Sequence, residues 1–341
     1  MQKNFISLLV IAGLLPLAFA CQNNKISQTI DLQQEYNISA KKSKSNWYGN
    51  LPTELKEYYA PAQGKVGLEL FNSLHDIISA NQKVESYTKS REFLFSTVDN
   101  ISNKRKQSGV LDAYSQVFIP GFGEFGESYR EVGDANKDGL PEDTINAEHT
   151  WPQSFYGKSL PMVSDLHAIQ TVLSMPNVMR SDFPFGEVNK DITYTTVCGS
   201  KLSILNNDGK LLSYSKLKAL TEKKIQAEKL KREKYIEPGL PNDEYKGIFE
   251  PCNAQKGNTA RNLLYFYLRY YDMSIQQGSY ENEAFWKTKV KIFIDWSEKV
   301  DPVDEREKIR SEIIYNKQGN RNPFVDIPEL ASIIGQDVFL K

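Results

Sequence analysis

The chain has 341 residues, of which 40% are hydrophobic and 25% are charged. This length and composition allow it to bury a core without depending on metals or disulfides to fold. Its formal net charge is −1 at pH 7, which excludes a protein that binds polyanions through its overall charge. Any nucleic-acid site must therefore come from a local cluster of cations.

The N-terminus has the layout of an export signal. Lys3 precedes an apolar run from Phe5 to Ala20, and small residues stand at Ala18 and Ala20, as in a secretory signal peptide over residues 1–20. No other segment is apolar enough to span a bilayer. The sequence therefore predicts an exported protein, which is periplasmic, secreted or an outer-membrane lipoprotein.

Two interpretations remain open for Cys21. It follows Ala20 directly and resembles the cysteine of a bacterial lipobox, so lipidation there would anchor the chain to a membrane. Ordinary signal-peptidase cleavage would instead leave Cys21 unmodified. Residues 21–57 are polar and have no sustained period, which predicts a tether ahead of the folded body.

The first amphipathic element after the tether is a helix from Val66 to Ala80. Its apolar residues recur at helical spacing and predict one face packed on the core. His75 lies on the edge of that face, where a structural role is favoured over a catalytic one.

Residues 134–143 read DANKDGLPED and open like a calcium-binding loop, with Asp134, Asn136 and Asp138 at alternate positions. The closing glutamate is missing because position 145 is Ile145. An acidic turn is the favoured interpretation, and a cation loop is the alternative.

Next comes a compact unit of strand, loop, strand and helix. The segments Ile145 to His149 and Asp165 to Thr171 partly alternate between apolar and polar residues, which predicts a small antiparallel hairpin. Met175 to Arg180 then predicts a short helix that ends before Pro184.

The remaining elements are mostly helical. Residues 214–237 carry eight basic and four acidic residues with a weak apolar stripe, which predicts a long helix with a solvated basic face. Apolar, aromatic patterns predict core helices over 258–271 and 282–300, followed by a shorter segment over 309–315. With the hairpin, these elements predict an α+β fold that is mostly helical.

Cys198 and Cys252 are the only cysteines besides Cys21. In an oxidising compartment two such cysteines often pair. A disulfide between them is one hypothesis, and two separate buried thiols are the other.

The hairpin unit carries the residues with chemical potential. His149 is one of three histidines, and a neutral imidazole, with an ordinary pKa of about 6.5, can accept a proton from water. Glu148 points to the other face of a regular strand, where it could reach a divalent cation together with Asn177 on the following helix. Such oxygen ligands suit Mg²⁺. From spacing alone, a structural role for His149 remains the more probable interpretation.

Several motifs, taken in their order along the chain, then favour a catalytic role for His149. The chain resembles the endonuclease I family, which are nucleases of the His-Me finger (ββα-metal) type. The resemblance extends over about residues 58–330 and rests on NAEHTWPQS at 146–154, SDLH at 164–167, Asn177 with Arg180, FPFGEV at 183–188, KGNTAR at 256–261, DPV at 301–303 and QGNRNPF at 318–324.

The resemblance implies a fold, a site and a reaction. It implies a mostly helical body around a small ββα-metal core within a nuclease domain over 58–335. It implies that His149 is the general base and that Glu148 and Asn177 bind Mg²⁺, with Ca²⁺ or Mn²⁺ as substitutes. The reaction that it implies is nonspecific hydrolysis of phosphodiester bonds in DNA, and in some members RNA, which leaves 5′-phosphate ends.

The chain departs from the family in the group that steadies the phosphate. Some members place an arginine between the two strands, but here the only basic residue of that loop is Lys158. Lys158 and Arg180 are the catalytic candidates, and Arg261 is a candidate for nucleic-acid binding. Each has an equal alternative as a surface or internal structural charge.

Other matched positions suggest support for the hairpin. Asp165 and His167 are expected to orient it from a second layer around the site. Residues 201–247 look like an insertion relative to shorter members, and their basic helix would extend the nucleic-acid surface.

The alternative function is a surface lipoprotein that binds nucleic acid without cutting it. Intact Glu148, His149 and Asn177 argue against this alternative, because a decayed site commonly loses a ligand or its base.

Overall fold

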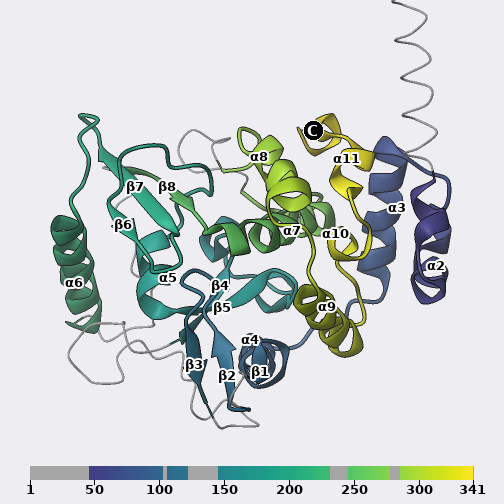
Figure 1. The fold of residues 1–341 in the computed structure, drawn as a ribbon, viewed down its shortest axis with the longest axis horizontal. Coiled ribbons are helices and arrows are strands. Elements are labelled where there is room, and N and C mark those ends of the chain that lie inside the picture. The colour runs from purple at the N-terminus through teal and green to yellow at the C-terminus, as the bar shows by residue number, and fades with distance from the viewer. Residues whose placement is uncertain (1–45, 103–105, 122–144, 231–244, 277–284, 341) are drawn as a thin grey trace, which may run out of the picture. The chain divides into compact units, whose positions relative to one another are not determined.

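The computed structural model describes residues 46–102, 106–121, 145–230, 245–276 and 285–340. The chain divides into two units, Met1–Leu51 and Pro52–Lys341. In the first unit the described residues form one 3₁₀ turn, η1 (Trp47–Asn50). The second unit mixes helices with small antiparallel sheets (Figure 1), which confirms the predicted α+β class.

Helices α2 (Thr53–Tyr59) and α3 (Gly67–Ala80) begin the second unit, joined by the 3₁₀ turn η2 (Ala60–Ala62). The buried side chains of α3 are Leu70, Phe71, Leu74 and Ile78, the helical spacing that the sequence predicted. The expected tether over 21–57 is too long at its C-terminal end. Helix α2 already starts at Thr53, and it is attached to the folded body at its last residue: Tyr59 is fully buried and its hydroxyl donates to Asp326, 2.7 Å away.

The next layer holds α4 (Tyr87–Phe93), the π-helical turn η3 (Leu94–Val98) and a three-stranded antiparallel sheet. Its strands are β1 (Asn100–Ser102), β2 (Ser108–Leu111) and β3 (Phe118–Pro120). The candidate calcium loop over 134–143 lies outside the described residues.

The hairpin unit follows as β4 (Ile145–His149), β5 (Ile169–Leu173) and α5 (Ser174–Arg180). The two strands are antiparallel, as predicted, and Glu148 is paired with Gln170. The loop between them contains the 3₁₀ turns η4 (Gln153–Tyr156) and η5 (Met162–Ser164). The second strand was predicted to begin at Asp165, but it begins at Ile169. The Asp165 side chain accepts the His167 N–H at 3.0 Å, which bends the chain before the strand.

A second antiparallel sheet has the order β6–β7–β8, with strands β6 (Tyr194–Thr195), β7 (Lys201–Asn206) and β8 (Tyr245–Glu250). The basic helix α6 (Tyr214–Leu230) lies between β7 and β8 in the chain, and residues 231–237 of the predicted helix lie outside the described part. A disulfide joins Cys198 to Cys252, with Cα atoms 5.8 Å apart.

The long helix α7 (Asn253–Tyr270) is buried along most of its length. It starts earlier than the predicted 258–271. Helix α8 (Val290–Asp295) and the π-helical turn η6 (Trp296–Val300) follow it. The aromatic residues of this region pack internally, as expected: the ring of Trp286, which precedes α8, stacks on Tyr267 of α7 with centroids 4.6 Å apart.

The C-terminal elements are α9 (Glu305–Gln318), α10 (Pro323–Asp326), α11 (Leu330–Ile334) and η7 (Gln336–Leu340). Helix α9 is longer than the predicted segment because the Asp304 side chain caps it by accepting the Glu307 N–H at 2.8 Å. Gly319 ends it with φ +83°, and a Cβ there would lie 2.5 Å from the Asn81 carbonyl oxygen, so only glycine fits.

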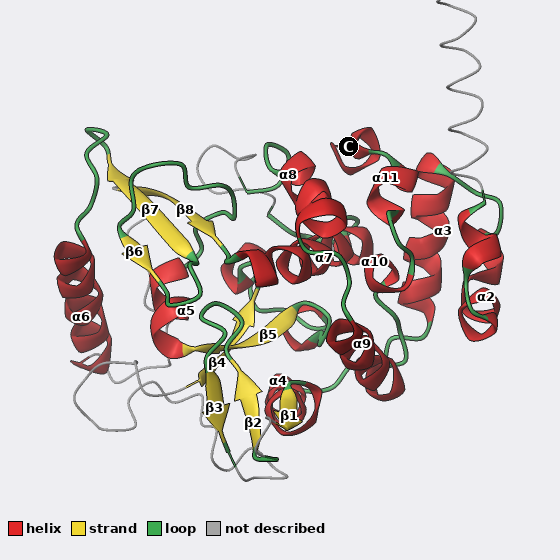
Figure 2. Ribbon diagram, in the orientation of Figure 1, coloured by secondary structure: helices red, strands yellow, loops and turns green. Residues whose placement is uncertain are grey.

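One face of the β4–β5 hairpin packs into a hydrophobic cluster that includes Ile145, Ala147 and Ile169, together with residues of η3, β2 and α9. In Figure 2, the helices α3, α9, α10 and α11 gather on one side of the hairpin and the β6–β7–β8 sheet on the other. The hairpin is therefore supported from several elements. Among the described residues, no helix is both long and apolar enough to cross a bilayer.

Candidate active site

Glu148 and His149 occupy the last two positions of β4, so regular strand geometry directs their side chains to opposite faces of the hairpin. Trp151, two residues further along, anchors the chain beyond the strand. Its ring stacks on Phe266 with centroids 5.0 Å apart, and its indole N–H donates to the Gln276 carbonyl at 3.1 Å. The NAEHTWP motif therefore consists of the end of a strand and a following segment that the Trp151 contacts hold in place.

Glu148 is buried, with 3% of its surface exposed. The Tyr114 hydroxyl donates to its Oε1 at 2.6 Å, and Arg180 Nη1 lies 3.3 Å from the same oxygen. Burial raises the pKa of Tyr114 well above its ordinary value of 10.0, which keeps that hydroxyl a donor. A buried carboxylate needs such partners to remain ionised.

His149 is 4% exposed, and its Nε2 lies 2.9 Å from the Val163 carbonyl oxygen. Because a carbonyl only accepts, Nε2 carries the proton and the Nδ1 of the neutral ring carries a lone pair. Nδ1 is buried and makes no hydrogen bond of ordinary geometry with a described residue. Burial lowers the pKa of His149 to about 4, and the positive charges of Lys158 and Arg180 lower it further, while interactions with the backbones of Val163 and Ala147 oppose the change.

Asn177 and Arg180 lie one turn apart on α5, on neighbouring positions of the helix surface. Arg180 is 1% exposed and donates to the Thr150 carbonyl at 2.8 Å and to the Ser181 carbonyl at 2.9 Å. Its contact with Glu148 connects α5, the helix that also carries half-buried Asn177, to that carboxylate.

Arg180 is also held from its other side. Its guanidinium lies over the ring of Phe185, with 4.4 Å to the centroid. This buried position is that of an internal structural charge. Lys158, by contrast, is exposed and follows left-handed Gly157, and its charge acts on His149.

Asp165 and His167 lie in a network behind the hairpin. The hydroxyls of Tyr265 and Tyr270 donate to Asp165 Oδ2 at 2.8 and 2.6 Å, and Gln318 Nε2 donates to Oδ1 at 2.8 Å. His167 Nε2 lies 3.0 Å from the Asn320 carbonyl, and burial lowers its pKa to about 4, opposed by Asp165. These contacts tie the SDLH motif to the QGN motif.

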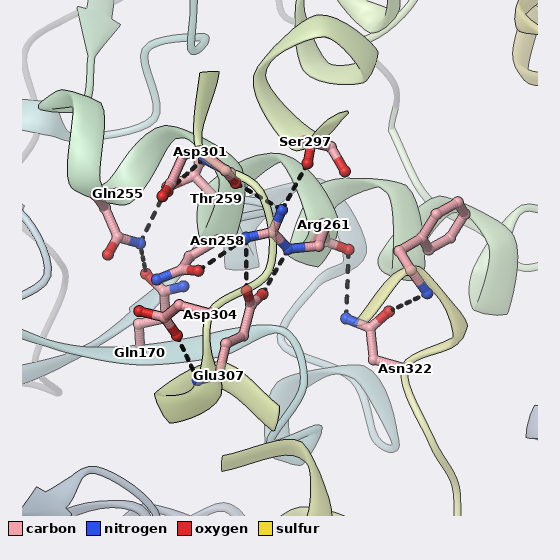
Figure 3. A network of polar contacts seen from close by, with 12 residues as sticks. Gln170, Gln255, Asn258, Thr259, Arg261, Ser297, Asp301, Asp304, Glu307 and Asn322 are labelled. Atoms are coloured by element: carbon pink, nitrogen blue, oxygen red, sulfur yellow. Dashed lines mark hydrogen bonds and ion pairs between the residues drawn. The ribbon is translucent and has the colours of Figure 1, made fainter. Parts of the chain in front are cut away.

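Arg261 is buried, with none of its surface exposed, and Figure 3 shows its side chain among its polar partners. Its Nε and Nη2 donate to the two oxygens of Glu307 at 2.7 and 2.5 Å, and its Nη1 donates to the carbonyls of Ser297 and Asp301, each at 2.8 Å. The structure therefore does not bring Arg261 to a surface where nucleic acid binds. The sequence left two alternatives for Arg261, and the structure favours the internal structural charge over nucleic-acid binding.

The KGN motif explains how Arg261 reaches the Asp301 carbonyl. A Cβ on Gly257 would lie 1.8 Å from that carbonyl oxygen, so α7 and the DPV segment approach closely only with glycine at this position. The two motifs are thus structural partners.

Sequence reasoning missed Tyr114. It lies in a loop between β2 and β3 and belongs to none of the matched motifs. Its burial and its contact with Glu148 depend on tertiary structure, so no local pattern signals them.

The donor set suits a hard cation. Glu148 offers a carboxylate oxygen and Asn177 an amide oxygen, and Mg²⁺ binds such groups while keeping several waters. Within the described part of the chain, no three His, Cys, Asp or Glu side chains form a group that could hold a metal ion. A site based on Glu148 and Asn177 would therefore rely on water for most of its ligands.

Comparison with known proteins identifies the class. The chain matches the endonuclease I family over residues 66–223 and 205–329. It therefore belongs to the endonuclease I family, and the enzyme is a nuclease, that is, a hydrolase.

Two named relatives are similar over most of their length. An extracellular ribonuclease of Bacillus amyloliquefaciens is 27% identical over 291 residues, which cover 82% of this chain and 78% of the relative. An extracellular ribonuclease of Bacillus subtilis (strain 168) is 28% identical over 287 residues, which cover 81% of this chain and 77% of the relative.

Proposed function

We propose that this nuclease is an exported, Mg²⁺-dependent endonuclease that hydrolyses phosphodiester bonds in RNA and DNA and leaves 5′-phosphate ends. The observation that carries the proposal is the state of His149. Its Nε2 proton is committed to Val163, which leaves the lone pair of the neutral ring on Nδ1. A ring held in one orientation, with a lone pair on its other nitrogen, is what a general base requires.

The residues of the hairpin have distinct roles in this proposal. His149 Nδ1 accepts a proton from water as the water oxygen forms a bond to phosphorus, and the bond from phosphorus to the 3′ oxygen breaks. Glu148 and Asn177 hold the cation, which when bound neutralises charge on the phosphate and the departing oxygen. Arg180 fixes Glu148, and exposed Lys158 is the candidate cation for the substrate backbone.

The proposed substrate and the proposed location of the protein are both based in part on the two relatives. The two relatives are named as extracellular ribonucleases, which favours RNA as a substrate and export of this chain. The N-terminal pattern agrees with export, and Cys21 is either lipidated or the unmodified first residue of the mature chain. Mass spectrometry of the mature N-terminus distinguishes the two outcomes.

The proposal is tested by incubating purified mature protein with supercoiled DNA and with single-stranded RNA, with Mg²⁺ and with EDTA. We expect cleavage that EDTA abolishes. In addition, His149→Ala should lower kcat by about 10²- to 10⁴-fold, the usual contribution of a general base. Thr150→Val, at the next residue, is the matched control and should keep kcat.

Full activity of His149→Ala would refute its role as the base. Tight binding of nucleic acid without cleavage under Mg²⁺, Mn²⁺ and Ca²⁺ would favour the alternative of a non-catalytic binding protein.

A further inference from the structure

Glu148 is held by a hydroxyl group that cannot move aside. Tyr114 is fully buried, and its ring packs against Phe249 and Phe185 with centroids 4.7 and 6.4 Å away. The hydroxyl donates to Glu148 Oε1 at 2.6 Å. A side chain packed in this way keeps its rotamer, so the position of the hydroxyl is fixed by the core.

The backbone of Tyr114 is fixed at its N–H by the preceding turn. Asp112 accepts from the N–H groups of Tyr114 at 3.3 Å and Ser115 at 2.8 Å. The same carboxylate accepts from the Leu173 N–H of β5 at 2.9 Å. The turn that carries Tyr114 is therefore attached to the hairpin that carries Glu148.

The carbonyl of Tyr114 is fixed by a distant segment. It accepts from Ser200 Oγ at 2.6 Å and from Thr196 Oγ1 at 2.8 Å. Ser200 Oγ in turn accepts the Cys252 N–H at 2.8 Å. Because Cys252 is bonded to Cys198, the disulfide closes the segment 196–200 against the start of α7.

We propose that Tyr114 is a positioning residue for the metal-binding carboxylate, and that the disulfide-closed segment 196–200 holds Tyr114 in place. The terminal torsion of a glutamate is broad and roughly two-fold, so the fixed Tyr114 hydroxyl, together with Arg180 at the same oxygen, determines where the second oxygen points. Hydrogen-bonded partners of ligating carboxylates commonly set metal affinity in this way. The inference rests on the proposed function, since it takes Glu148 to be a ligand.

The test measures Mn²⁺ binding to the purified mature protein, without substrate, by the loss of the free-ion signal in electron paramagnetic resonance. Tyr114→Phe keeps the packed ring and removes only the hydroxyl. We expect its Kd for Mn²⁺ to rise by about 10- to 100-fold, the usual effect of losing such a partner.

Tyr59→Phe is the matched control. Tyr59 is also fully buried and donates to a largely buried carboxylate, Asp326, at 2.7 Å. It should lose thermal stability as Tyr114→Phe does, but keep the wild-type Kd for Mn²⁺. A double variant, Cys198→Ser with Cys252→Ser, should raise the Kd by less than Tyr114→Phe, because it acts through Ser200.

The outcomes separate the two proposals. If the wild type and Glu148→Gln bind Mn²⁺ equally, Glu148 is not a ligand and both the proposed site and the role of Tyr114 fail. If Glu148→Gln loses binding while Tyr114→Phe keeps the wild-type Kd, the metal site stands and the positioning role of Tyr114 is refuted. If Tyr114→Phe and Tyr59→Phe weakened Mn²⁺ binding equally, the effect would be one of general stability, and the positioning role of Tyr114 would again be refuted.

Discussion

Burial of His167 should make the stability of this nuclease depend on pH. The ring is 1% exposed, and its pKa is lowered from 6.5 to about 4. The unfolded chain therefore binds a proton on His167 at a higher pH than the folded chain does. The stabilising contribution is fully present above pH 6.5 and is lost as the pH falls from 6.5 towards 4.

The size of the effect follows from that difference. A lowering of the pKa from 6.5 to about 4 corresponds to about 3 kcal/mol of unfolding free energy. In His167→Gln the new side chain does not titrate and can still donate to the Asn320 carbonyl. Between about pH 7.5 and pH 4.5, the wild type should therefore lose about 2 to 3 kcal/mol more stability than His167→Gln.

Urea unfolding of both proteins, followed by fluorescence at a series of pH values, measures this difference. Thr150→Val is the control, because it removes a buried hydrogen bond to the Ala168 carbonyl, 3.1 Å long, and no titratable group. Its deficit of about 1 kcal/mol should be the same at every pH. If the unfolding free energies of the wild type and His167→Gln changed equally with pH, burial of His167 would be refuted as the cause of the pH dependence.

Two further predictions concern the cations named from the sequence. Arg261→Met should lower the unfolding free energy by about 3 to 5 kcal/mol because it leaves Glu307 buried and unpaired; a variant of normal stability with weaker nucleic-acid binding would contradict the structural role. Lys158→Gln should keep kcat, raise KM and reduce the slope of log KM against log salt by about 0.7 to 0.9, the loss of one phosphate contact. The exposed Lys291 on α8 gives the control substitution, Lys291→Gln, and an unchanged slope in Lys158→Gln would remove Lys158 from the substrate surface.

The sequence was most informative where local patterns decide structure. The pattern of α3 was sufficient to place that helix, because it buries one regular face. The partial alternation over Ile145–His149 placed the strand, although both of its faces are buried. It was less informative where a single side chain fixes a boundary. The Asp165 side chain delays β5, and the Asp304 cap extends α9. Both are hydrogen bonds that apolar periodicity does not represent.

The residues of the candidate site also fall into those that local patterns predict and those that depend on distant contacts. The order of Glu148, His149 and Asn177 on strand and helix could be read from motifs. The motifs could not show whether an arginine binds phosphate or is an internal structural charge. The environment of Arg261 is made by hydrogen-bond partners 36 to 46 residues away in the chain. Tyr114 was missed for the same reason, since it meets Glu148 across a separation of 34 residues.

The network behind the hairpin also sets the order in which the enzyme can mature. Asp165 is bonded to Gln318, 153 residues further along the chain, and His167 to Asn320 at the same separation. A growing polypeptide therefore carries Glu148 and His149 long before their support exists. The network behind the hairpin is complete only once Gln318 and Asn320 are present, so a chain truncated before Gln318 contains the candidate motif without these contacts.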